Sequence, residues 1–323
     1  QMESSNDSAN PSIHEVSDPS RRVFVQGGMA ALATGVLAPW LNGCAAGASA
    51  TESLFTFKGI PAATGDTLVV PEGYIAEVIA PWGEPVGIAG NMPAFKADAS
   101  NSAAEQAVQV GMHHDGIHYY PLDGSRRGLL NNEYTDDGLL HPQGMANWSA
   151  EKVRKSQAAH GVTVIEIEAR DGGWQMVRPS RFARRHTGAT PFEVRGPAAG
   201  HWLMRTAADP AGRTVLGTLN NCASGKTPWG TYLSGEENFI NYFDGGDALD
   251  PHQRRWGLRK TGFYRWPEHD ERFNAVKHPN EPNRFGWVVE IDPMDPAATP
   301  IKRTALGRAA HEGAWVAVTK DNR

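Results

Sequence analysis

Residues 220–238, NNCASGKTPWGTYLSGEEN, give the clearest indication of the fold. Short β-prone pieces flank and interrupt this stretch, Arg213–Leu219 before it and Thr231–Leu233 within it, and Gly225, Pro228 and Gly230 lie between them. Glycine and proline favour turns, so the pattern predicts a strand, a loop and a second strand. A thiol then ends one strand and a pair of carboxylates ends the next. This arrangement can bring soft and hard metal ligands to one edge of a sheet.

Composition excludes some classes of partner and favours a β-rich fold. The 323 residues carry a net charge of −5 and a pI near 6.2, which does not suggest binding to nucleic acid or to an anionic membrane. The 35 glycines, 22 prolines and 10 tryptophans suit many short strands joined by turns. The length fits one large all-β domain as well as two smaller ones.

The N-terminus has the features of an export signal. Residues 1–20 are polar and are predicted to be disordered, and Arg21-Arg22 then precede a short apolar run, Gly27–Trp40. Paired arginines before such a run indicate the twin-arginine export machinery, which carries folded proteins. We therefore expect a disordered N-terminus and signal peptide over residues 1–50, a folded domain over residues 51–323, and a periplasmic or secreted protein.

The end of the signal has two interpretations. Leu41–Cys44 resembles a lipoprotein cleavage box, which would make Cys44 a lipid anchor. Ala48–Ala50 fits an ordinary small-residue cleavage site, and we favour simple cleavage. In that case Cys222 is the one cysteine of the mature chain.

The remaining chain is mostly hairpins with one helix. Alternating patterns around Asp-Gly and similar turns predict hairpins over 116–133, 161–177 and 286–306, and Ser149–His160 is predicted to be a helix capped by Ser149. The polar stretch 244–283 is interpreted as a long loop over one face. Residues 315–319 are predicted to form a last strand without a partner. Repeated hairpins fit a β-propeller and a β-sandwich equally well.

Four predicted strand ends carry ligand-type side chains. In a propeller such ends meet at one mouth of the central channel, where a thiolate with carboxylates would suit iron and further oxygens would suit calcium. Taken singly, a lone cysteine is more often a buried apolar residue than a metal ligand, and a pair of glutamates is more often solvent-exposed than metal-binding. A basic cluster at Arg181, Arg184, Arg185 and His186 would either bind phosphate or form a solvated loop. The four strand ends are Asn131–Glu133, Asn220–Cys222, Glu236–Asn238 and His311-Glu312.

A family resemblance extends over nearly the whole chain. The central block GTLNNCASGKTPWGTYL (217–233) with EENF (236–239) resembles the PhoX-type bacterial alkaline phosphatases, and so does the twin-arginine start. The other matching segments are DGIHYYPL (115–122), NEYT (132–135), GPAAG (196–200), GWVVEIDP (286–293), LGR (306–308) and HEGA (311–314).

The resemblance implies an exported, monomeric, metal-dependent alkaline phosphatase that hydrolyses small phosphomonoesters. Its implied fold is an all-β, six-bladed β-propeller with an iron–calcium cluster at its mouth, here incomplete because the chain stops mid-propeller. The implied metal ligands are Cys222, Glu237 and Glu312. The implied nucleophile is a metal-bridging oxygen, and the phosphate-binding arginine would lie in a C-terminal half beyond this sequence. Neighbours of the site are expected to be Glu133, Asn221, Glu236 and His311.

Two alternatives remain open beside the phosphatase. One is a calcium-dependent propeller lactonase or esterase, which has no need of a thiolate. The other is a non-catalytic binding propeller stabilised by metal. Because neighbours on a strand face opposite sides, Glu236 is expected to point away from Glu237, and Glu236→Gln is expected to be mild.

Overall fold

The computed structural model describes residues 58–122 and 125–321. The predicted signal region, with Arg21, Arg22 and Cys44, lies outside the described residues. The chain divides into two units, residues 1–75 and 76–323. The described part of the first unit contains a turn at Pro71–Tyr74 and neither helix nor strand. In the described part of the chain, no helix is both long and apolar enough to cross a membrane.

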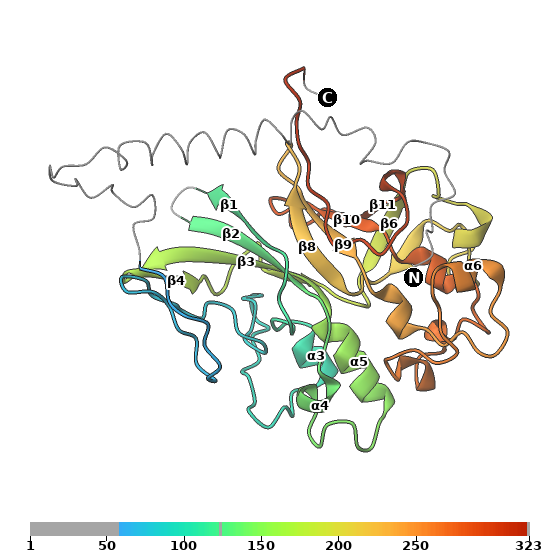
Figure 1. Ribbon diagram of the computed structural model, residues 1–323, viewed down its shortest axis with the longest axis horizontal. Helices are drawn as coiled ribbons and strands as arrows, with labels where there is room; N and C mark the ends of the chain where they lie inside the picture. Colours follow the sequence, from blue (N-terminus) through green and yellow to red (C-terminus); the bar gives the residue numbers. More distant parts are fainter. Residues whose placement is uncertain (1–57, 123–124, 322–323) are drawn as a thin grey trace, which may run out of the picture. The chain divides into compact units, whose positions relative to one another are not determined.

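The second unit contains two β-sheets among its described residues (Figure 1). In the first sheet the order is β1-β2-β3-β4, with β5 also paired to β3. All its pairings are antiparallel. The strands of this sheet are β1 (Ile117–Leu122), β2 (Ser125–Asn132), β3 (Gly161–Arg170), β4 (Gly173–Met176) and β5 (Arg184–His186).

The second sheet has the order β7-β6-β11-β10-β9-β8. Its pairings are antiparallel except for the parallel pair β6–β11. β8 packs against β1 and β2, so the two sheets meet at this strand. The strands are β6 (Pro191–Arg195), β7 (Thr214–Leu216), β8 (Asn221–Lys226), β9 (Tyr232–Glu236), β10 (Val288–Ile291) and β11 (Ile301–Arg303).

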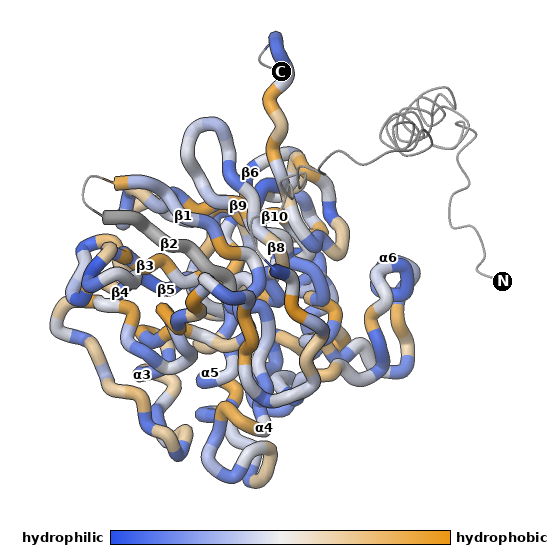
Figure 2. The backbone as a smooth tube through the Cα atoms, turned by 60° about the vertical axis from the view of Figure 1, so that its left-hand side comes forward, coloured by the Kyte–Doolittle hydropathy of each residue, from blue (hydrophilic) through white to orange (hydrophobic). Residues whose placement is uncertain are grey.

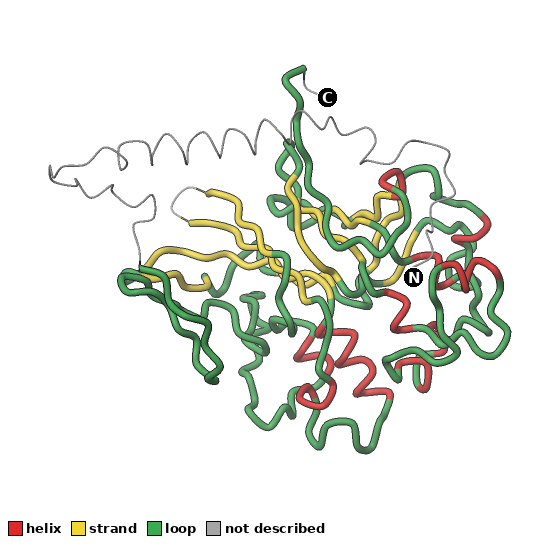
Figure 3. The backbone as a smooth tube through the Cα atoms, in the orientation of Figure 1, coloured by secondary structure: helices red, strands yellow, loops and turns green. Residues whose placement is uncertain are grey.

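Helices are short and lie at the margins of the sheets (Figure 3). Among the described residues α5 is the longest helix, and Ser149 caps it as predicted by accepting a hydrogen bond from Lys152 N. α3 packs against α5, and Ala103 N donates to Glu151 Oε1 over 2.8 Å. The α-helices are α3 (Ala103–Gln106), α4 (Asp137–Leu140), α5 (Ala150–Ala159) and α6 (Pro251–Arg255). The 3-10 turns are η2 (Trp202–Met204), η3 (Phe239–Tyr242), η4 (Trp266–Glu268), η5 (Glu271–Phe273), η6 (Glu281–Arg284) and η7 (Thr304–Leu306).

The largest hydrophobic cluster corrects the prediction for residues 244–283. This stretch is not a loop laid over a surface, because several of its apolar side chains are buried in the core. Exposed residues alternate with these buried ones along the stretch, and the α6 turn is hydrophilic in Figure 2. Aromatic side chains form most of this core, so the stretch is buried although its sequence shows only weak hydrophobic periodicity. The members from this stretch are Leu258, Tyr264, Trp266, Phe273 and Ala275.

The predicted fold class is supported only at a coarse level. The described chain is mainly β with a few short helices, and the order of each sheet runs from one edge strand to another, so neither sheet closes on itself. The predicted hairpins are present. The predicted strand at 315–319 is wrong, because residues 307–320 form neither strand nor helix.

Candidate metal centre

A β-bulge sets the position of Cys222. β8 and β9 pair at Asn221–Glu236 and again at Ser224–Ser234, so three steps on β8 face two on β9. The extra residue lies at Cys222 or Ala223. Bulges re-aim side chains and occur beside active sites. Asn220, directly before β8, adopts a left-handed φ of +50°, a conformation that asparagine tolerates better than most residues.

Three ligand-type side chains meet at this bulge. Asp115, Glu133 and Cys222 each offer a ligand atom, and all three atoms lie within 4.8 Å of one another. The Cys222 thiol donates to Asp115 Oδ2, with 2.7 Å between sulfur and oxygen. Asp115 precedes β1, Glu133 follows β2 and Cys222 is the second residue of β8. Paired strand ends therefore bring together residues that are distant in sequence.

The electrostatics of Glu133 connect this cluster to two more carboxylates. Burial, together with the nearby charges of Asp115, Glu237 and Glu312, raises the pKa of Glu133 to about 7. Burial also raises the pKa of the Cys222 thiol, as does its hydrogen bond to Asp115. Without a compensating cation, negative charges gathered in this way repel one another.

The donor set fits the metals that the family resemblance implies. One sulfur with several carboxylate oxygens suits a transition metal such as iron, and the remaining carboxylates suit a hard cation such as calcium. Cys222 is buried, Glu133 is half-buried and Asp115 is exposed, so the cluster is reached from solvent on one side. Glu237 is half-buried and Glu312 is exposed.

Glu236 does not belong to this cluster. Its carboxylate is fully buried and accepts hydrogen bonds from Lys302 Nζ at 2.7 Å and Thr218 Oγ1 at 2.9 Å. The backbone N–H groups of Gly286 and Trp287 also donate to it. Glu236→Gln is therefore expected to destabilise the fold, because this change would leave a buried lysine without its counter-charge, while its effect on metal binding stays a prediction.

Asn221 and His311 also have structural roles. The Asn221 amide is buried and donates to Thr218 Oγ1 over 2.8 Å, within the same network as Glu236. The His311 ring bonds the carbonyl of Gly307, with 2.9 Å from Nε2 to the oxygen, and its backbone N–H donates to Glu236 O. Neither side chain is among the three grouped ligand atoms.

Two glycines allow the segment that carries Glu312 to lie on the second sheet (Figure 1). A Cβ at Gly225 of β8 would collide with the carbonyl oxygen of Ala314, and one at Gly235 of β9 would collide with that of His311. The segment 311–314 is thus held by close backbone approach instead of strand pairing. These contacts place the segment with Glu312 beside the start of β8 and the end of β9.

Asp115 was not among the residues that sequence analysis proposed as ligands. It lies in the run His113-His114-Asp115, directly ahead of a predicted hairpin strand. A cluster of ligand-type residues at a strand start was the available signal. Ligands were predicted at strand ends only, whereas antiparallel pairing places the start of β1 beside the end of β2.

Arg185 and His186 of the basic cluster proposed for phosphate are buried in the protein interior, Arg184 is partly buried and Arg181 is exposed. Buried Arg185 donates to the carbonyls of Gln109 and His160, and Arg184 donates to those of Phe182 and Asp292. His186 is buried on β5. Arg184 and Arg185 satisfy backbone acceptors, so the phosphate interpretation of the cluster is not supported.

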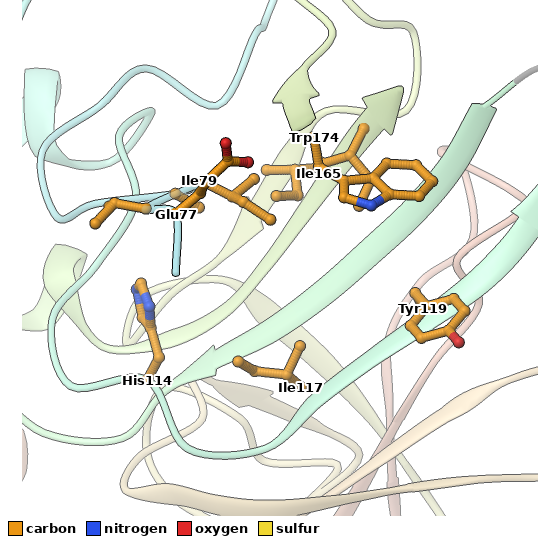
Figure 4. A pocket seen from close by; sticks show the side chains of 10 residues that line it. Glu77, Ile79, His114, Ile117, Tyr119, Ile165 and Trp174 are labelled. Carbon is orange, nitrogen blue, oxygen red and sulfur yellow. The ribbon is translucent and has the colours of Figure 1, made fainter. Parts of the chain in front are cut away.

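An apolar pocket of about 560 Å³ lies against the first sheet, on the face that carries Ile117, Tyr119 and Ile165 (Figure 4). Ile117, Tyr119 and Ile165 point into it, and Gly128, which is paired with both Tyr119 and Ile165, contributes no side chain there. Tyr120, on the opposite face of β1, packs with Tyr232 of β9. The residues that line the pocket include His114 but none of Asp115, Glu133 and Cys222, so the pocket is distinct from the grouped ligand atoms.

Comparison with known proteins gives one family. The family model for the alkaline phosphatase PhoX matches residues 55–323. A solved structure of Pseudomonas fluorescens PhoX in complex with vanadate, a transition state analogue, is similar with a TM-score of 0.79 and 48% sequence identity. That match covers 82% of this chain and 47% of that chain, so the present chain spans about half the length of this relative. No protein of curated function matches the sequence. Because the family model covers most of its length, the chain belongs to the PhoX alkaline phosphatase family.

Proposed function

We propose that the chain is part of an exported alkaline phosphatase that hydrolyses small phosphomonoesters at a metal centre. The proposal rests on one observation in a member of the PhoX family: the ligand atoms of Asp115, Glu133 and Cys222 all lie within 4.8 Å of one another. The P. fluorescens relative is described in complex with vanadate, a transition state analogue. This description supports a phosphoryl-transfer site in the relative and favours a phosphatase here over a lactonase or a binding propeller.

The proposed ligands are Cys222, Glu237 and Glu312 from the family pattern, with Asp115 and Glu133 added from the geometry. Bound iron and calcium would neutralise charge on phosphoryl oxygens and activate an oxygen nucleophile. The protein residues supply anionic donors that are already oriented. The bulge fixes Cys222, and the hydrogen bond from Glu133 N to His113 O, 3.0 Å long, fixes the backbone between the two carboxylates.

We also propose that the two sheets are blades of a six-bladed propeller in a monomeric protein. Support comes from their edge-to-edge strand orders and from the extent of the relative, of which this chain matches 47%. Export by the twin-arginine machinery through Arg21-Arg22, a cleaved signal within residues 1–50 and a domain over residues 51–323 remain parts of the proposal.

The test is phosphate release by the full-length protein loaded with iron and calcium. Wild type is expected to hydrolyse phenyl phosphate, and Glu133→Gln is expected to lower kcat/KM by at least about 100-fold. Glu193→Gln is the matched control, because Glu193 lies in β6, forms an exposed ion pair with Arg195 and is not one of the proposed ligands. A metal-loaded wild type that releases no phosphate would contradict the proposal.

A further inference from the structure

A stacked pair of aromatic rings is carried by residues that adjoin two members of the metal centre in the sequence. The rings of His113 and Tyr134 lie 3.9 Å apart between centroids with an interplanar angle of 7°. Both residues are exposed, and Tyr134 keeps 40% of its surface in solvent. His113 precedes Asp115 by two residues, and Tyr134 directly follows Glu133. The pair is therefore attached to both carboxylates of the cluster through one or two backbone steps.

The backbone under the pair is fixed at several points. Glu133 N donates to His113 O over 3.0 Å, which joins the two segments that carry the rings. Thr135, on the other side of Tyr134, donates its N–H to the hydroxyl of buried Tyr264 over 3.2 Å. The same hydroxyl donates to Thr135 O over 3.1 Å. The exposed ring of Tyr134 thus stands between two anchored residues.

His113 adopts a backbone conformation that residues other than glycine seldom use. Its φ is +48°, in the left-handed region. Such conformations cost of order 1–3 kcal/mol and persist where the surroundings enforce them, often at functional sites. The exposed stack buries little apolar surface that would offset this cost. Its position beside the ligands gives a reason for the conformation that packing does not.

We propose that His113 and Tyr134 form a stacking surface for a flat aromatic group carried by the phosphomonoester. This inference rests on the proposed phosphatase function and adds a substrate preference to it. Consecutive Cα atoms are about 3.8 Å apart, so the Cα atoms of His113 and Tyr134 lie within about 8 Å of the Cα atom of Asp115 or Glu133. With the phosphoryl group at the cluster, an aryl or nucleoside group on the ester oxygen reaches the rings. An aliphatic group gains less there, because it has no π face.

The test measures binding and not turnover. Phenylphosphonate and methylphosphonate carry the same anionic group, and neither is hydrolysed as an ester. Calorimetry with the full-length, metal-loaded protein is expected to show tighter binding of phenylphosphonate by about five- to tenfold, the scale of one aromatic stack. Tyr134→Leu should remove this preference while leaving the Kd for methylphosphonate unchanged. Tyr134→Phe should retain it.

Two further variants serve as the second measurement and the control. His113→Asn removes one ring while keeping a residue that tolerates the left-handed backbone, and it should also reduce the preference. Tyr119→Leu removes an exposed tyrosine that lines the apolar pocket and should leave the preference intact.

The outcomes separate this inference from the proposed function. Equal affinity of wild type for the two phosphonates, together with hydrolysis of phosphomonoesters, would overturn the stacking surface and leave the phosphatase standing. A Tyr134→Leu variant that loses affinity for both phosphonates alike would show a structural role and would also overturn it. Absence of both phosphonate binding and hydrolysis in wild type would overturn the proposed function and this inference together.

Discussion

The thiol of Cys222 donates a hydrogen bond to Asp115 across 107 residues of sequence, with 2.7 Å between the two atoms. A buried sulfur and a carboxylate oxygen so close together form a ready pair of metal ligands. Glu133 completes the cluster from the end of β2, and its raised pKa reflects burial followed by three neighbouring carboxylates. Antiparallel pairing of β1 with β2 and the packing of β8 on both strands account for the meeting of these residues.

Glu236→Gln is expected to destabilise the fold strongly. Lys302 Nζ lies 2.7 Å from Glu236 Oε1, and both side chains are fully buried. Breaking one half of a buried pair leaves an uncompensated charge, which costs about 3–5 kcal/mol. Urea unfolding should show this loss, and Glu236→Gln with Lys302→Met should recover most of it. The exposed pair Glu193–Arg195 supplies the control, since Glu193→Gln should cost less than about 1 kcal/mol. A loss below 1 kcal/mol for Glu236→Gln would contradict the assigned role.

Gly235→Ala is expected to lower metal affinity without removing a ligand. The added methyl group would collide with the carbonyl oxygen of His311 and shift the segment that carries Glu312. Displacement of one ligand's support lowers metal affinity by about 10–100-fold. Metal titration with circular dichroism as a fold check makes the measurement. Gly59→Ala, where a Cβ meets nothing within 4 Å, should bind metal as wild type does. Unchanged affinity in Gly235→Ala would refute the close approach of this segment.

The stability of the protein is expected to fall in mild acid because of His186. Neither ring nitrogen has a hydrogen-bond partner among the described residues, and burial lowers the pKa of His186 to about 3, assisted by Arg184 and Arg185. The unfolded pKa is about 6.5, so below this pH the unfolded state binds a proton that the native state does not. The free energy of unfolding therefore decreases as pH falls from 6.5 towards 3, by about 1.4 kcal/mol per pH unit for this group.

Urea unfolding at pH 6.5, 5.5 and 4.5 tests this dependence. His186→Leu should reduce the slope by about one proton relative to wild type. His252→Gln, at an exposed position in α6, should keep the slope of wild type. Identical slopes in wild type and His186→Leu would show that His186 is not held neutral.

Export in folded form is expected to depend on Arg21 and Arg22. Replacing both with Lys keeps the charge and removes the paired guanidinium groups of the signal. Precursor should accumulate in the cytoplasm, as cell fractionation and immunoblotting would show. Replacing Arg126 and Arg127 with Lys in the same way provides a control outside the signal. Unchanged export of the Arg21/Arg22 variant would reject the twin-arginine proposal.

Local sequence patterns predicted much of the secondary structure, whereas the residues of the metal centre could be identified fully only from the pairing of the strands. Alternation and turn residues indicated the hairpins, and Ser149 indicated the start of α5. The irregular stretch 244–283 was misread because isolated aromatic residues such as Trp266 bury deeply without any period. Lys302 gave no sequence signal of burial. Asp115 was missed because its importance depends on which strand start lies beside the end of β2, a consequence of tertiary pairing.

The central claim is that the cluster around Cys222 binds metal, and elemental analysis of the full-length protein purified after native export tests it most directly. The account predicts iron and calcium in stoichiometric amounts and an iron–thiolate absorption band in wild type. Cys222→Ser should lose the band and most of the iron, while Glu193→Gln should keep both. Wild type without bound metal, or Cys222→Ser with the iron content and absorption of wild type, would contradict the account.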